Sequence, residues 1–399
     1  MAVPSPFEQN SRFKNILLVT GIMLISINLR PALAGVGPLV STIRESTGLS
    51  NTMLGLLTTL PLLAFGFVST LTPLFTKRLG IEGTLALSMI LLTAGLLVRI
   101  IPGNMMLFSG TLLLGIAIAF GNVLLPSLVK RDFPNHTGIM TSLYSSMLGI
   151  GATLAAGVSV PLAHDLDWGW RGSLGAWAGL SLLALAIWLP QLKSLTMPEH
   201  NRSFWKALKE LGRSKVAWQV AVFMGLQSLA FYVILAWLPE ILQSRGLDAN
   251  TAGWMLSLSQ GMGVLGTIFI PTWAERQTDQ RGLVWILMTC EIVSLIGLML
   301  PNAFLPGLWA SLIGLALGGS FGLSLLFIVL RAPDSQTATE LSGMAQSIGY
   351  LLAAIGPTLF GALHDITNAW LVPLLFLAVL VAVKLFVGLG AGRPQAIEH

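Results

Sequence analysis

One arginine interrupts the first long apolar stretch of the 399-residue sequence. Arg30 lies 15 residues beyond Asn15, which is about 22 Å along a helix. If the stretch crosses a bilayer, an unpaired arginine near its centre costs roughly 3 kcal/mol, so the guanidinium should face protein or a wet cavity. Pro31 removes a backbone hydrogen bond and kinks the helix at the same level. We expect Arg30 to bind an anionic or electronegative ligand, with outward snorkelling and a structural bond to carbonyls as alternatives.

The three tyrosines all lie in apolar stretches. Tyr232 lies about 24 Å into its stretch, close to the depth of Arg30, and with Phe231 it is expected to supply an aromatic wall. Tyr350 is a second candidate for ligand contact. Tyr144 is expected to be an anchor at the membrane interface, the commoner role of a membrane tyrosine.

Several other polar side chains interrupt the apolar stretches, and each must find a partner there, usually on another helix. Ligand contact is the alternative for each of them. They are Asn28, Asn122, Gln227, Gln260, Ser324 and Gln346.

Glu291 is the only carboxylate well inside an apolar stretch, at about 14 Å depth. A buried acid with a raised pKa can carry a coupled proton, which makes Glu291 the proton-coupling candidate. Its counterpart in the internal repeat described below is Thr93. The five histidines fall in loops or tails, so we expect no metal site and no cofactor.

The composition decides the class of protein. Charged residues make up 10% of the chain, against roughly 25% in soluble domains, and hydrophobic residues make up 54%. A soluble fold cannot hide so much apolar surface. The pI near 9.6 does not indicate a nucleic-acid partner, because the basic residues are few and lie in short loops. The sequence therefore predicts an integral membrane protein in a lipid bilayer.

A bilayer core of about 30 Å takes about 20 apolar residues in a helix. Stretches of that length predict twelve transmembrane helices. They cover residues 15–40, 51–76, 83–101, 105–129, 138–161, 171–190, 216–238, 251–274, 282–300, 304–330, 341–363 and 370–391. With both termini on one side, 17 of the 22 Lys and Arg residues fall on that side, four on the other, and Arg30 within the membrane. The positive-inside rule then places both termini in the cytoplasm.

The two halves of the sequence resemble each other at a spacing of about 200 residues. Pro73 matches Pro271, 198 residues later, and His164 matches His364, 200 residues later. Six predicted spans separate each pair, so the two copies share one orientation. Parallel six-helix repeats are an architecture of membrane transporters, with the substrate site between the halves.

The repeat predicts an all-α fold of two six-helix bundles, 1–195 and 216–399, joined by a cytoplasmic linker over 196–215. A membrane sensor should carry an added soluble domain, and an enzyme should show paired carboxylates or Ser/His partners at membrane depth. The sequence has neither feature. We therefore expect a transporter rather than an enzyme, with the bundles rocking about a site near Arg30.

Several short motifs resemble one family of transporters. They include Asn28-Leu29-Arg30-Pro31, Lys130-Arg131-Asp132-Phe133-Pro134, Trp237-Leu238-Pro239 and the run 341–350. These motifs are similar to those of the cyanate-transporter/nitroimidazole-exporter (CynX/NimT) family of the major facilitator superfamily. The resemblance implies alternating access, small nitrogen-containing solutes and a bacterial inner membrane. It also implies that the helices of Tyr232 and Tyr350 border the central cavity.

The loop after the second span departs from the superfamily pattern Gly-x-x-x-Asp-Arg-x-Gly. Lys77 stands in place of the acid, before Arg78, whereas the second copy keeps an acid in Glu275-Arg276. The resemblance therefore implies a cytoplasmic gating contact at Glu275, with Arg276 and Arg78 as further gating candidates.

The sequence thus predicts a monomeric secondary transporter of a cyanate-like or nitroimidazole-like solute or anion, with Arg30 as the residue that anchors the substrate. Efflux is one candidate direction of transport, and protons are a candidate coupling ion. The alternative is a broad-specificity, proton-coupled multidrug exporter, which would need many apolar contacts and few polar anchors. A non-transporting membrane sensor is the rival from another class.

Overall fold

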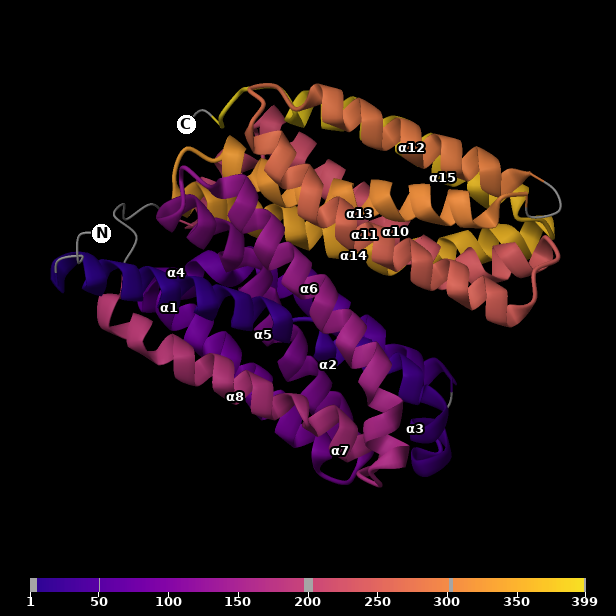
Figure 1. Cartoon of the computed structure of the whole chain (residues 1–399), viewed down its shortest axis with the longest axis horizontal. Coiled ribbons are helices and arrows are strands. Elements are labelled where there is room, and N and C mark those ends of the chain that lie inside the picture. Colours follow the sequence, from indigo (N-terminus) through magenta and orange to yellow (C-terminus); the bar gives the residue numbers. More distant parts are fainter. Residues whose placement is uncertain (1–5, 50, 197–203, 301–303, 398–399) are drawn as a thin grey trace, which may run out of the picture. The chain divides into compact units, whose positions relative to one another are not determined.

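The computed structural model describes residues 6–49, 51–196, 204–300 and 304–397, and every regular element in these ranges is helical (Figure 1). The first half contains α1 (Pro6–Asn28), α2 (Pro31–Ala34), α3 (Val40–Thr47), α4 (Asn51–Ile100), α5 (Asn104–Asp132), α6 (Thr137–Val160), α7 (Gly169–Gly175) and α8 (Trp177–Trp188). The rest contains α9 (Phe204–Leu211), α10 (Lys215–Ser244), α11 (Ala249–Glu275), α12 (Arg281–Met299), α13 (Pro306–Arg331), α14 (Ser335–Thr367) and α15 (Leu371–Ala391). Three short helical turns, η1 (Gly37–Leu39), η2 (Pro161–Asp165) and η3 (Leu189–Ser194), complete the described elements.

Eleven segments of the described residues are long and apolar enough to cross a membrane. One of them, Thr59–Ile100, has 42 residues and would extend about 63 Å as one straight helix, twice the thickness of a bilayer core. Gly80 interrupts this segment with φ 69° and ψ 176°, a conformation that only glycine adopts readily. α4 is therefore two helices in series, which agrees with the separate second and third spans expected from the sequence.

The chain forms two compact units that are discontinuous in sequence. Unit 1 comprises Met1–Val68, Leu74–Leu125 and Met147–Asn201. Unit 2 comprises Ser69–Pro73, Pro126–Ser146 and Arg202–His399. Segments from α4, α5 and α6 thus belong with the second half of the chain, and the contacts that place them there are described below.

In unit 1, α1 packs along α8, as Figure 1 shows. The two helices approach closely where Gly21 faces Trp188: a Cβ on Gly21 would lie 2.7 Å from the indole. The indole N–H of Trp188 donates to the carbonyl of Glu82 at 3.0 Å, which ties α8 to the second part of α4.

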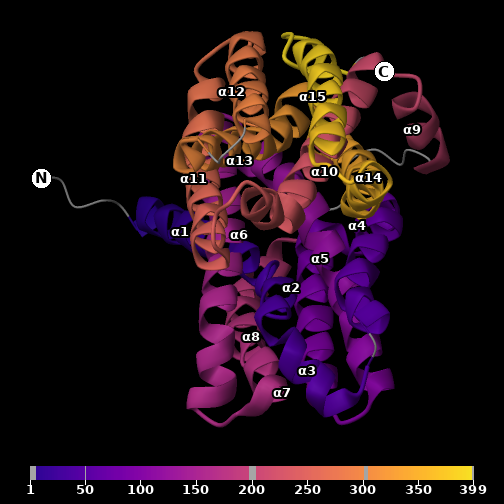
Figure 2. The same cartoon turned by 90° about the vertical axis from the view of Figure 1, so that its right-hand side faces the viewer.

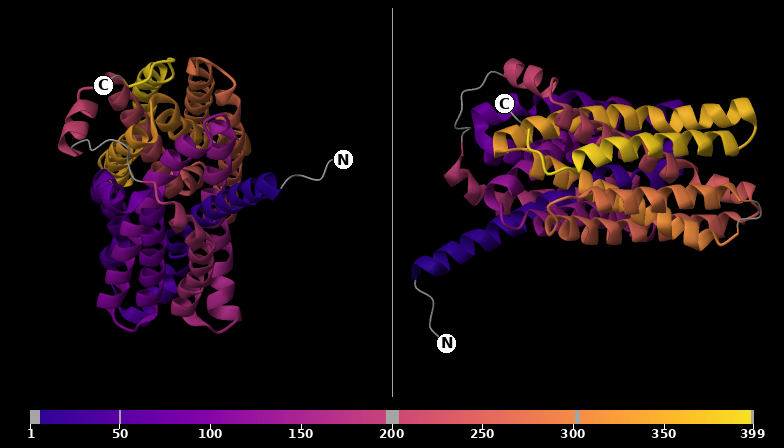
Figure 3. Two further views of the ribbon diagram at one scale, coloured as in Figure 1. Left: turned by 90° about the vertical axis from the view of Figure 1, so that its left-hand side faces the viewer. Right: turned by 90° about the horizontal axis from the view of Figure 1, so that it is seen from above.

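In unit 2, α11 packs on α13, α10 on α14, and α12 on both α13 and α15. α12 and α15 lie together in Figure 2, and α14 and α15 run side by side in the right-hand view of Figure 3. The small residues of α13 permit this packing, because a Cβ on Gly314 or Gly318 would collide with the α11 backbone. Side-chain caps fix three helix starts, with Ser214, Asp248 and Asp334 accepting from the first turns of α10, α11 and α14.

Candidate substrate site and gating contacts

The first span breaks at Arg30. α1 ends at Asn28 and α2 begins at Pro31, as expected for a proline that cannot continue the hydrogen-bond ladder. The carbonyl of Arg30 accepts from the N–H groups of Leu33 and Ala34 at 3.1 and 3.0 Å. The side chain of Arg30 is half-buried. The break therefore presents a guanidinium and irregular backbone at one level of the span.

Two other helices of unit 1 press against this break. A Cβ on Gly121 of α5 would lie 2.7 Å from the Leu29 side chain, and one on Gly151 of α6 would collide with the carbonyl oxygen of Ile27. Only glycine allows the backbones to come so close. The break is consequently held between α5 and α6 rather than facing lipid on all sides.

Arg99 is one of the four basic residues that the charge distribution assigns to the outer side, and its side chain is 1% exposed inside unit 1. Its Nη1 donates to the carbonyl of Ala32 at 2.8 Å, two residues beyond Arg30. Its Nε and Nη2 are buried without a hydrogen-bond partner in the described structure. The Arg99 guanidinium thus bonds to the backbone just after the break. The position of Arg99 in the last turn of α4 gave no signal of this role in the sequence.

The two asparagines near the break have different surroundings. The Asn28 amide donates to the carbonyls of Leu24 at 2.7 Å and Leu180 at 3.3 Å, so its nitrogen joins α1 to α8. Asn122 is buried on α5, one residue after the glycine that contacts Leu29. Asn28 and Arg30 thus lie at the helix break, and Asn122 is buried on the helix that packs against Leu29.

The aromatic candidates of unit 2 lie on α10 and α14. Phe231 and Tyr232 are partly exposed, and their rings meet edge to face with centroids 5.4 Å apart. Tyr350 on α14 is 3% exposed. The two helices are in contact at Gly225 of α10, where an added Cβ would lie 2.6 Å from the Leu352 side chain of α14.

The glutamines of unit 2 differ in how much of their amide is used within the protein. Gln227 donates to the carbonyl of Leu317 on α13 at 3.3 Å and accepts from Ser228 at 3.1 Å. Gln346 is buried on α14, whereas Gln260 on α11 is only partly buried. Gln227 therefore has a structural role whatever else it contacts.

Two sequence expectations need correction from burial. Tyr144 is 1% exposed, so its hydroxyl cannot lie at the membrane surface as an anchor would. Lys384 is one of the 17 basic residues that the sequence assigns to the cytoplasmic side, but it lies inside α15 with 1% exposure. The sequence pattern alone could not show which helices cover these two side chains.

Glu291 forms a buried ion pair with Lys384. Glu291 on α12 is fully buried, and the Lys384 Nζ lies 2.5 Å from its Oε2. In unit 1, the counterpart Thr93 shares a hydroxyl–hydroxyl bond of 2.8 Å with Ser181 of α8. The third and sixth spans of each half are thus joined by polar side chains, neutral in one half and charged in the other.

Glu275 is the last residue of α11, and its side chain contacts the start of α6 within unit 2. Its carboxylate accepts from the Thr137 hydroxyl at 3.0 Å and from the Ile139 N–H at 3.4 Å. A carboxylate is favoured there, because the first N–H groups of a helix lack intrahelical partners. Gly138 allows the approach, since a Cβ there would lie 2.8 Å from the Glu275 Oε2.

Further polar contacts within unit 2 join the same segments of the first half to α11 and α14. Ser142 donates to the carbonyl of Ile268 at 2.7 Å, the Thr70 N–H donates to Ser347 at 3.1 Å, and the hydroxyls of Ser127 and Thr339 bond to each other. These bonds explain why residues 69–73 and 126–146 belong to unit 2.

Arg78 and Arg276, the two basic gating candidates, have exposed side chains. Neither forms a salt bridge among the described residues.

Comparison with known proteins identifies the family. The model of the Major Facilitator Superfamily matches residues 16–357. The chain is 45% identical to the uncharacterized transporter YycB of Bacillus subtilis, covering 98% of this chain and 97% of that protein. It is 42% identical to the 2-nitroimidazole transporter of Escherichia coli, covering 96% and 97%, and 29% identical to the Escherichia coli cyanate transport protein CynX, covering 90% and 93%.

The fold is similar to that of solved transporters. The proton:xylose symporter XylE aligns over 96% of this chain and 97% of its own, with a TM-score of 0.77 and 14% identity. An identity this low supports the fold alone.

Proposed function

The chain belongs to the Major Facilitator Superfamily and, within it, to the family of cyanate and 2-nitroimidazole transporters, and from this premise we propose that it carries a small nitrogen-containing solute or anion by alternating access. It is a multi-pass membrane transporter, not an enzyme. Its location is the bacterial inner membrane, where it acts as a monomer with both termini in the cytoplasm. The distribution of Lys and Arg supports this orientation, and it keeps its sign after Lys384 is removed from the count.

The observation that carries the proposal is the helix break at Arg30. Here a half-buried guanidinium stands beside irregular backbone, in the middle of a candidate span. A planar guanidinium can present two parallel donors to a carboxylate-like or nitro group, whereas an ammonium offers only a point charge. We assign Arg30 as the substrate anchor, with Asn28 and Asn122 beside it.

Arg99 strengthens the positive potential of the same region. Its guanidinium reaches the Ala32 carbonyl and forms no salt bridge among the described residues. Charges in a low-dielectric interior interact strongly, so this potential favours an anion or the negative end of a dipole near Arg30. The aromatic pair Phe231–Tyr232, with Tyr350, Gln227, Gln260 and Gln346, is the set that the second half contributes.

Alternating access requires a closed cytoplasmic side in one state. We assign this closure to the contacts of Glu275 with Thr137 and Ile139, together with the hydroxyl bonds around Ser127 and Ser142. The net free energy of these few hydrogen bonds is small enough for a substrate to shift the equilibrium to a state in which they are broken. Arg276, next to Glu275, and Arg78 have exposed side chains and a weaker claim to a gating role.

Proton coupling at Glu291 stays a prediction. A proton taken up by Glu291 would leave Lys384 as a buried cation without its partner, which is a costly state. The pair therefore favours a structural role, and any proton that binds Glu291 must be accompanied by a change at Lys384.

A thermal-shift screen of the purified chain tests the proposed substrate class. Cyanate and 2-nitroimidazole are compared with bulky lipophilic cations, since only ligands that prefer the folded state raise the melting temperature. We expect cyanate or 2-nitroimidazole to stabilise the protein, and uptake into proteoliposomes to follow the same order. Stabilisation by the bulky cations alone would favour the broad multidrug exporter instead.

A further inference from the structure

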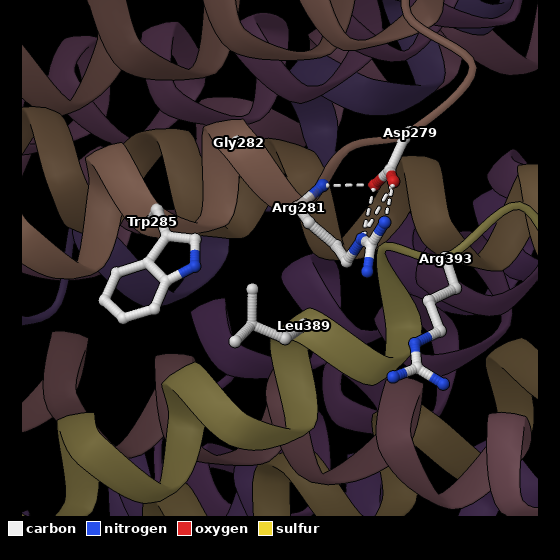
Figure 4. Close-up of a pocket in the computed structure, with 6 residues that line it drawn as sticks. All are labelled: Asp279, Arg281, Gly282, Trp285, Leu389 and Arg393. Atoms are coloured by element: carbon white, nitrogen blue, oxygen red, sulfur yellow. Dashed lines mark hydrogen bonds and ion pairs between the residues drawn. The ribbon is translucent and has the colours of Figure 1, made fainter.

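A cleft of about 410 Å³ opens between the start of α12 and the end of α15. Asp279, Arg281, Gly282, Trp285, Leu389 and Arg393 line it, as Figure 4 shows. All six belong to unit 2. The cleft lies where two candidate spans end on the same side, and therefore at a membrane–water interface.

The base of the cleft is held by backbone hydrogen bonds. The Gln280 N–H donates to the carbonyl of Gly392 at 3.1 Å, which ties the entry of α12 to the exit of α15. The buried Arg331 of α13 donates from Nε to the carbonyl of Ala391 at 2.7 Å and from Nη2 to the side chain of Gln280. The two walls are therefore fixed before any ligand arrives.

At its exposed surface the cleft carries one positive charge without a carboxylate partner among the described residues, and the buried Arg331 at its base adds to the positive potential. Asp279 accepts from the Arg281 backbone N–H at 2.9 Å and from its Nη2 at 2.5 Å, so these two charges cancel. The hydrogen bonds from Arg281 also lower the pKa of Asp279, which keeps the carboxylate ionised at neutral pH. Arg393, on the opposite wall in Figure 4, forms no salt bridge within the described residues.

The other side of the cleft is apolar. The Trp285 indole is 53% exposed, and Leu389 stands across from it (Figure 4). Exposed apolar side chains continue along both helices from this point, with Ile286 at 48% and Phe386 at 74%. Exposed tryptophan at the end of a span is typical of the headgroup level of a bilayer.

The corresponding turn of the first half is built differently. Glu82, 198 residues before Gln280, accepts from the Thr196 N–H at 3.1 Å, so the chain after η3 contacts this turn. In the second half, a Cβ on Gly282 would meet no atom within 4 Å.

We propose that this cleft binds an anionic phospholipid with a single net negative charge. Its phosphate contacts Arg393 and the outer edge of Arg281, and its acyl chains lie over Trp285 and Leu389. A basic site at the end of a helix pair suits a lipid phosphate, and the adjoining apolar wall has no use for a free phosphate ion. The exposed guanidinium of Arg393 is the charge that one anionic headgroup would neutralise.

Native mass spectrometry of the detergent-solubilised full chain tests this proposal, with phosphatidylglycerol, phosphatidylcholine and inorganic phosphate as the probes. We expect preferential retention of phosphatidylglycerol. One basic residue near a membrane surface contributes about 1 kcal/mol, so Arg393→Gln should reduce that retention about 5-fold. Trp285→Ala should reduce the retention of both phosphatidylglycerol and phosphatidylcholine.

Lys209→Gln is the matched control, because it removes an exposed basic residue of α9 outside the cleft. An equal loss in Arg393→Gln and Lys209→Gln would overturn the proposal, since it would indicate attraction to the surface as a whole. Displacement of the lipid by inorganic phosphate, or binding that ignores Trp285→Ala, would overturn it as well. Both cleft residues are exposed, and an unchanged melting temperature of the lipid-free variants verifies that they fold.

Discussion

Lys384 of unit 2 and Arg99 of unit 1 are two buried basic side chains with different kinds of partner. In unit 2, the Lys384 ammonium lies 2.5 Å from the Glu291 carboxylate, so the two charges cancel inside the α12–α15 pair. In unit 1, Arg99 is equally buried but bonds only to the neutral carbonyl of Ala32. The first charge is used to join two helices, whereas the second leaves a positive potential beside the break at Arg30.

The internal repeat makes this difference informative. The helix pair equivalent to α12–α15 is the second part of α4 with α8, where Thr93 and Ser181 form a neutral bond. Joining these two helices therefore does not require an ion pair, because a neutral hydrogen bond joins the equivalent helices of unit 1. Arg99 bonds to the backbone two residues beyond Arg30, which is why we connect its charge with substrate binding.

The largest expected effect comes from breaking the ion pair on one side. Lys384→Met should lower the free energy of unfolding by about 3–5 kcal/mol, because it leaves a buried carboxylate without its partner. Ser181→Ala is the control in unit 1 and should cost only about 1 kcal/mol, the worth of one neutral hydrogen bond. Chemical unfolding of the detergent-solubilised protein measures both.

Replacing both partners sharpens the same test. Glu291→Leu with Lys384→Met should return the stability close to that of the parent, because an apolar pair avoids the burial of charge. If this variant transports with an unchanged pH profile, Glu291 is structural. Loss of the pH dependence in a folded, binding-competent double variant would instead assign the coupled proton to Glu291.

Glu275 extends the comparison to a carboxylate held by a helix start rather than by a cation. Glu275→Gln should favour separation of α6 from α11 by about 1–2 kcal/mol, a typical coupling energy. A thiol introduced by Thr272→Cys in a Cys290→Ser background should then react faster with a water-soluble reagent. Glu240→Gln, which changes an exposed acid of α10, should leave the rate unchanged. An unchanged rate in Glu275→Gln would count against its gating role.

The smallest expected effect concerns Arg99. Arg99→Met should weaken cyanate binding about 5-fold, or about 1 kcal/mol, since it removes a nearby positive charge and the bond to Ala32. Stability should change little, because the lost hydrogen bond is offset by the removal of a buried unpaired charge. Arg99→Lys should restore much of the cyanate affinity. Arg44→Met is the control, and an equal effect in both variants would contradict a local role.

The sequence predicted the parts of this molecule that depend on local patterns. Span lengths follow from apolar runs, and the break before Pro31 follows from the missing N–H of proline. Even the close approach of α13 to α11 could be expected from glycines four residues apart at Gly314 and Gly318.

What the sequence did not predict depends on partners from distant helices. Lys384 and Glu291 are 93 residues apart, and nothing local marks them as a pair. Arg99 stands in the last turn of α4, where a charge usually faces water, and only the fold shows that it turns inward to Ala32. One signal was available for Lys384, which has 14 uncharged residues before it (370–383) and eight after it (385–392), and so lies inside its apolar stretch as Glu291 does.

The central claim is that Arg30 anchors the substrate, and isothermal titration of cyanate and 2-nitroimidazole against the purified protein tests it most directly. Hydrogen bonds to a charged group contribute about 1.5–3 kcal/mol, so Arg30→Ala should weaken binding of the true substrate roughly 10- to 150-fold. Arg30→Lys should lie between that variant and the parent, because it keeps the charge but loses the paired donors. The exposed Arg44→Ala serves as the control, and melting temperatures verify folding. Binding by folded Arg30→Ala as tight as that of the parent would contradict the account.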